Sequence, residues 1–126
     1  MLRKLVFSLI AVTALSLVVM AQDDKITLEG YIVDKACATG SGKVARAADP
    51  QEAAANEPKS CILMVSCLKS GLGIYSGGKF TEFDVKGVAL AKAAIEKSKK
   101  DKGAKFKVIG KMTDGKLAVG SITEIK

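Results

Sequence analysis

Three cysteines are the side chains in this sequence with the clearest capacity for chemistry. Cys37 stands alone, whereas Cys61 and Cys67 form a C-x5-C pair further along the chain. Thiols can cross-link a chain or bind a soft metal ion, and this spacing differs from the C-x-x-C of thiol oxidoreductases. A disulfide and a metal site are therefore competing interpretations of the same residues.

The 126-residue chain contains neither histidine nor tryptophan. Imidazole is the usual general base near neutral pH and the usual partner of a nucleophilic serine or cysteine. Its absence excludes those catalytic pairs, and also histidine-ligated zinc or haem. Asp34, Glu82 and Asp84 are isolated acids near the ends of expected strands, with no pattern that indicates acid-base catalysis. We therefore expect that the protein is not an enzyme.

The first residues have the pattern of a secretory signal peptide. Arg3 and Lys4 precede a charge-free apolar run, and Val19 and Ala21 are small residues suited to cleavage after position 21. A membrane span is the alternative, but the apolar run of about 16 residues is short for one. The pattern predicts a leader over 1–21 and a secreted or periplasmic protein with no transmembrane segment in its mature form.

Charge is unevenly distributed along the chain. The formal net charge is +7, and it would be about +5 without Arg3 and Lys4. Nine lysines lie between Lys92 and Lys116, against three acids. A basic face of this kind can attract an anionic component of the cell envelope. We expect no nucleic-acid partner, because exported proteins seldom meet nucleic acid as a physiological ligand.

Cysteines of small exported domains normally form disulfides. If 59–70 is one helix, a rise of about 1.5 Å per residue separates the Cα atoms of Cys61 and Cys67 by roughly 9 Å. A disulfide spans at most about 7 Å between Cα atoms. Cys37 is then the common partner. The favoured pair is Cys37 with Cys67, and Cys61 is the alternative partner.

The competing metal site would use Cys37, Cys61, Met64 and Cys67. The last three recur every third residue, which spreads them over about a third of a helix circumference. Thiolate and thioether ligands favour copper as Cu(I), whereas zinc would need a further N, S or O donor. The disulfide interpretation needs no cofactor, and this alternative implies copper or zinc.

The spacing of apolar residues predicts five strands, with tight turns at Gly77-Gly78 and Asp114-Gly115. A bulge at Gly120-Ser121 would reconcile the two apolar faces of the last strand. The expected strands cover 26–33, 72–76, 79–83, 105–112 and 116–125.

Helices are expected at three places between these strands. Asp49 and Pro50 mark the start of a short one, 59–70 forms a second, and a third runs from about Val88 to 101–103. Met64, Val65, Leu68 and Cys61 should face the sheet from the second helix.

Three strands, a helix and two strands are the order of an OB-type barrel. We expect an α+β, mainly β fold, a small five-stranded OB-like barrel with an inserted helix after strand 1 and a helix before the final hairpin. An open α+β sheet is the alternative. One domain covers 22–126, with a flexible insertion at 38–58. Tyr31 and Tyr75 are candidate ligand-binding residues, since aromatic rings on such a sheet can stack on sugars or bases.

The segments 30–37, 61–71 and 78–84 together resemble a group of small exported bacterial proteins of unknown function. The shared features are a cysteine after the first strand, a C-x5-C helix and a glycine-led hairpin. The resemblance implies an exported protein with an OB-like barrel and supplies no activity. Members often have a histidine just before the first helical cysteine, where this chain has Pro58, Lys59 and Ser60.

Overall fold

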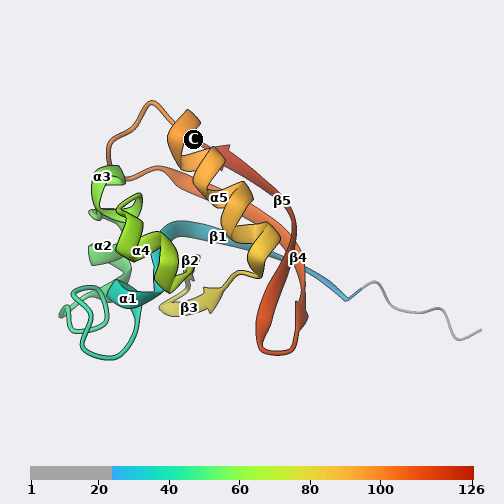
Figure 1. Ribbon diagram of the computed structural model, residues 1–126, viewed down its shortest axis with the longest axis horizontal. Helices are drawn as coiled ribbons and strands as arrows, with labels where there is room; N and C mark the ends of the chain where they lie inside the picture. Colours follow the sequence, from blue (N-terminus) through green and yellow to red (C-terminus); the bar gives the residue numbers. More distant parts are fainter. Residues whose placement is uncertain (1–23) are drawn as a thin grey trace, which may run out of the picture.

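Residues 24–126 are described by the computed structural model, and they form one five-stranded antiparallel sheet with short helices (Figure 1). The strands lie in the order β3-β2-β1-β4-β5. Their bounds are β1 Lys25–Asp34, β2 Leu72–Ser76, β3 Lys79–Glu82, β4 Lys105–Thr113 and β5 Lys116–Ile125. The expected leader lies outside the described residues. Within 24–126 no helix has the length and apolar character needed to span a membrane.

The central strand β1 pairs with two partners along its length. Residues from Lys25 to Gly30 pair with β4, and residues from Tyr31 to Asp34 pair with β2. At the change of partner, a Cβ on Gly30 would lie 2.1 Å from the carbonyl oxygen of Tyr75. Only glycine permits this close approach of two backbones.

The expected mainly β class is confirmed, but the sheet is not closed. Between the edge strands β3 and β5, the described residues show one isolated parallel bridge, Phe83 to Leu117. The backbone N–H of Asp84 donates to the carbonyl of Leu117 beside it, at 3.0 Å. An ion pair also joins Lys116 of β5 to Glu82 of β3, at 3.6 Å. In the described part of the chain these contacts do not form a ladder between the two edge strands, so the barrel that the strand order predicts is not established.

Both predicted hairpin turns are confirmed. Gly77 and Gly78 join β2 to β3, and Asp114 and Gly115 join β4 to β5, all with positive φ. The predicted bulge is also present, because the β4–β5 register skips Gly120. The residues of the two turns therefore determine where the hairpins form.

One face of the sheet is covered by α5, Val85–Lys97 (Figure 1). Asp84 caps it, with Oδ1 accepting from the N–H of Gly87 at 2.8 Å. The helix ends at Lys97, several residues earlier than expected. The main core lies beneath it and contains Ile32, Ile62, Leu72, Ile74, Phe83, Ala91, Ile95, Phe106, Val108, Leu117 and Val119.

Four short helices between β1 and β2 gather at one end of the sheet (Figure 1). They are α1 Lys35–Ala38, α2 Pro50–Ala55, α3 Lys59–Ile62 and α4 Val65–Ser70. The start of α2 is as predicted, since Asp49 Oδ1 accepts from the N–H of Glu52. A second small core of Val33, Ala38, Val44, Ala54 and Tyr75 lies beneath them. The insertion at 38–58 thus contributes fully buried side chains, and its flexibility stays a prediction.

The single helix expected over 59–70 is wrong. The chain breaks between α3 and α4 at Met64, whose ψ of 141° is extended. Consequently Met64 and Val65 are 53% and 69% exposed instead of facing the sheet. Ile62 fills the core from α3 instead, with Leu68 partly buried in α4. Neither proline nor glycine marks this break in the sequence, so apolar periodicity alone could not place it.

We predict that Gly30→Ala lowers the free energy of unfolding by at least about 2 kcal/mol, because the added methyl group must displace the backbone of β2. Urea unfolding followed by circular dichroism measures the loss. Gly120→Ala is the control, since the nearest atom to its Cβ would be the carbonyl oxygen of Ile109, at 3.3 Å. Equal losses in the two variants would contradict the close-approach argument.

Candidate metal site

Asp34 lies where β1 ends and α1 begins, and its side chain is fully buried at 0% exposure. It caps α1, with Oδ2 accepting from the N–H of Cys37 at 3.0 Å. Its other oxygen, Oδ1, has no hydrogen-bond partner. The acid expected to be isolated near a strand end is thus a buried carboxylate with one free acceptor.

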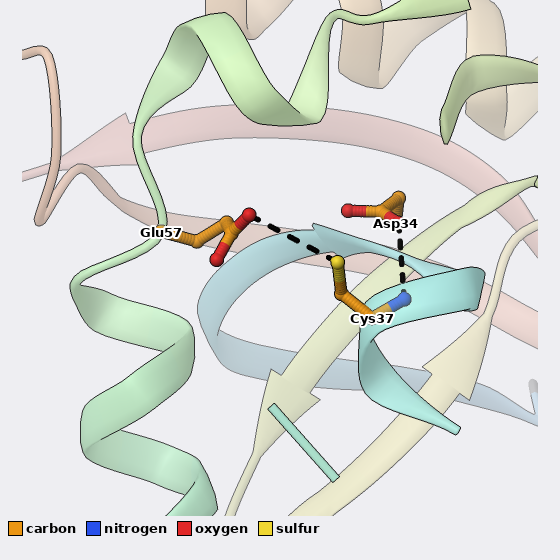
Figure 2. A group of neighbouring side chains, drawn as sticks. All are labelled: Asp34, Cys37 and Glu57. Carbon is orange, nitrogen blue, oxygen red and sulfur yellow. Dashed lines mark hydrogen bonds between the residues drawn. The ribbon is translucent and has the colours of Figure 1, made fainter. Parts of the chain in front are cut away.

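Glu57, in the loop between α2 and α3, is the second buried carboxylate, at 4% exposure. Figure 2 shows its side chain reaching toward Cys37, whose Sγ lies 4.0 Å from Oε1. Oε2 has no hydrogen-bond partner, although Lys43 Nζ lies 3.4 Å away as an ion pair. The Lys43 side chain is 68% exposed, so this ion pair is formed from the solvent side.

Asp34, Cys37 and Glu57 therefore form a compact group of potential metal ligands. One ligand atom from each residue can be chosen so that all three lie within 4.8 Å of one another. Glu57 forms an ion pair with Lys43, whereas Asp34 forms none within the described residues. Burying carboxylate charge is costly unless it is compensated. A bound divalent cation would supply that compensation.

The environment of Cys37 disfavours its thiolate. Burial, followed by the carboxylates of Asp34 and Glu57, raises the pKa of this thiol to about 12. Without a bound cation, the thiol therefore stays protonated at neutral pH. It donates to Oε1 of Glu57 in that state.

Cys67 lies in α4, which packs against α1. The N–H of Ala36 donates to Ser70 Oγ at 3.2 Å, and Ser70 Oγ donates to the carbonyl of Cys67 at 2.7 Å. Burial and the neighbouring Asp34 carboxylate raise the pKa of the Cys67 thiol. Packing of α1 against α4 thus brings Cys67 into the neighbourhood of Asp34 and Cys37.

The sulfur-only metal site that the sequence suggested, with Cys37, Cys61, Met64 and Cys67 as ligands, stays a prediction. Met64 is exposed at the helix break, and Cys61 lies half-buried in α3. In the described part of the chain all three cysteines are free thiols. Pairing of Cys37 with Cys67, or with Cys61, stays a prediction.

Tyr31 and Tyr75 pair across β1 and β2. Tyr75 is 7% exposed and belongs to the second small core, against which Tyr31 packs. Burial leaves Tyr75 little surface with which to stack on a ligand.

Comparisons with known proteins give no match for this chain among family models, curated proteins or solved structures. The resemblance to small exported bacterial proteins therefore stays a prediction.

We predict that iodoacetamide modifies Cys37 slowly in the reduced, metal-free protein. At about pH 8, a thiol of pKa 12 is ionised roughly 1,000-fold less than one at the ordinary value of 9.0. Peptide mass spectrometry measures the rate at Cys37 in the folded protein and in concentrated urea, where the thiol is solvated.

Asp34→Asn should speed the modification of folded protein, because asparagine can still cap α1 but carries no charge. Glu52→Gln, an exposed change on α2, is the matched control and should have no effect. A Cys37 that reacts equally fast folded and unfolded would contradict the raised pKa.

Proposed function

We propose that the protein is an exported binding module that holds one divalent, zinc-class metal ion through Asp34, Cys37 and Glu57. The observation that carries the proposal is the pair of buried oxygens without a hydrogen bond, Asp34 Oδ1 and Glu57 Oε2, beside the Cys37 thiol. Export rests on the leader pattern of 1–21.

The donor set favours zinc over copper. Zinc accepts carboxylate oxygens at about 2.0–2.2 Å and thiolate sulfur at about 2.3 Å, so its ligand atoms lie roughly 3.5 Å apart. The ligand atoms of the present group lie within 4.8 Å of one another, so side-chain movement would have to bring them closer. Copper(I) prefers sulfur ligands, whereas two of the three donors of this group are carboxylates. Cys67 is a candidate fourth ligand, because α4 packs against α1.

Metal binding would also compensate the negative charge that is buried in the site. The incoming ion displaces the thiol proton of Cys37, because a coordinating cysteine binds as thiolate. The ion would then neutralise both buried carboxylates, of which Glu57 alone is paired with Lys43. The folded protein should therefore gain stability on binding, since the unfolded chain has no preformed site.

A disulfide between Cys37 and Cys67 is the second candidate role for the cysteines. Packing of α1 against α4 supports it, as does the oxidising compartment implied by export. Such a bond closes a loop of about 30 residues and would stabilise the fold by about 3–4 kcal/mol in the chain-entropy account. In this state the protein would be a stapled structural or binding module.

The strand order supports an OB-like architecture for this module. Three strands precede α5 and two follow it, and Phe83 bridges to Leu117 where a barrel would close. Full closure is part of the proposal.

We predict that the reduced protein binds one zinc ion and melts at a higher temperature when zinc is present. Competition with a chromophoric chelator measures the affinity. Cobalt substitution provides a second measurement, since a cobalt–thiolate charge-transfer band reports bonding to Cys37. Glu57→Gln and Cys37→Ser should each weaken binding by about 100-fold or more, because second-shell changes alone cost 10- to 100-fold.

Glu52→Gln and Met64→Leu are the matched controls, and each should bind zinc like the parent chain. Met64→Leu also tests the copper alternative, because it removes the exposed thioether that this alternative uses as a ligand. Unchanged zinc affinity in both Glu57→Gln and Cys37→Ser would refute the site.

We predict that disulfide formation and zinc binding exclude each other. Oxidised glutathione would form the Cys37–Cys67 bond and release two molecules of reduced glutathione per protein. Free-thiol counting by mass spectrometry then identifies the pair, and the oxidised protein should no longer bind zinc. Full zinc affinity in a protein with Cys37 in a disulfide would contradict the assignment of Cys37 as a ligand.

A further inference from the structure

A groove with a volume of about 720 Å³ lies between α5 and the end of β5, and neither Asp34, Cys37 nor Glu57 lines it. Figure 1 shows α5 running alongside β5 over the sheet. Its apolar lining consists of Leu90, Ala93, Ala94, Phe106, Ile122 and Ile125. Phe106 is 2% exposed and belongs to the main core, so the floor of the groove continues the core outward.

The rim of the groove is basic. Lys97, Lys99, Lys100 and Lys126 line it, and all four are exposed. None of them forms an ion pair with an acid among residues 24–126. The one acid in the lining is Glu124, and it accepts a hydrogen bond from Ser98 Oγ at 2.7 Å. The groove therefore combines an apolar floor with uncompensated positive charge.

We propose that this groove binds a single-chain anionic amphiphile of the fatty-acid class. The alkyl tail would lie on the apolar floor between α5 and β5, and the carboxylate would lie among the lysines of the rim. Charge complementarity selects this occupant, because a cationic or neutral amphiphile gains nothing from four unpaired lysines. The proposal is independent of the metal site, which uses none of these residues.

The shape of the lining also argues against a polyanion as the occupant. A polysaccharide or nucleic acid would use the lysines but leave the apolar floor uncovered. Base stacking needs exposed aromatic rings, and the aromatic ring of the groove, Phe106, is buried. An alkyl tail instead removes the floor from water.

Titration calorimetry with dodecanoate below its critical micelle concentration tests the proposal on the full mature chain. Dodecanoate should bind with one-to-one stoichiometry, and dodecyltrimethylammonium and dodecyl maltoside should bind at least tenfold more weakly. Lengthening the alkyl chain of the ligand from decanoate to dodecanoate should tighten binding by up to about fourfold per methylene.

Ala93→Trp should abolish binding, because its side chain fills the groove from an exposed position on α5. Ala89→Trp is the matched control, one turn earlier on the same helix, exposed and outside the groove. Each variant adds the only tryptophan of the chain, whose fluorescence reports that the fold is intact.

Lys97→Glu and Lys99→Glu should each weaken dodecanoate binding by about fivefold or more, whereas Lys86→Glu, outside the groove, should not. No binding of dodecanoate to the parent chain would overturn the proposal, and so would equal binding of the cationic amphiphile. Binding that survives Ala93→Trp but is lost in the lysine variants would show that dodecanoate binds to the charged lysines without entering the groove. That outcome would likewise overturn the proposal.

Discussion

The burial of the Asp34 carboxylate is the constraint on which the helical end of this fold depends. The residue ends the central strand β1, pairs with Leu72 of β2 and is completely shielded from water. An ionised group in this position is tolerated only with hydrogen bonds and a compensating charge. The first turn of α1 supplies one hydrogen bond through the N–H of Cys37. The chain must therefore turn into α1 directly after β1, and this turn places the Cys37 thiol beside the carboxylate.

Local chemistry explains which parts of the fold could be predicted from the sequence. Gly77-Gly78 and Asp114-Gly115 define their hairpins because only a few residue types adopt positive φ at low cost. The start of α2 was predictable for a similar reason, since Asp49 is a capping residue followed by proline. Nothing local marks the break at Met64, where one expected helix becomes α3 and α4. Tertiary packing decides it, because it directs Ile62 into the core.

The difference between local sequence signals and tertiary packing also explains what could be predicted of the site. Sulfur was evident from the sequence because cysteine is rare and its spacing is easily recognised. The oxygen donors were not evident, because Asp34 and Glu57 are ordinary acids in the sequence. They become potential metal ligands only because the fold buries them. Glu57 lies 20 residues after Cys37 and reaches it only because the loop after α2 folds back over α1. One usable signal was present at Asp34, an aspartate directly after an apolar strand, which is a typical helix cap.

The segment that follows α5 contacts both the start of α3 and the lining of the groove. The N–H of Lys59 donates to the carbonyl of Asp101 at 2.7 Å, and the Lys59 ammonium donates to the carbonyl of Ser98. Lys59 begins α3 only two residues after Glu57, while the Ser98 hydroxyl holds Glu124 in the lining of the groove. The loop that carries Lys99 and Lys100 of the rim is therefore fixed by α3, the helix that follows Glu57. Since these contacts are made by Lys59 and Ser98 rather than by any proposed ligand, the two proposed sites share a support and yet use separate chemistry.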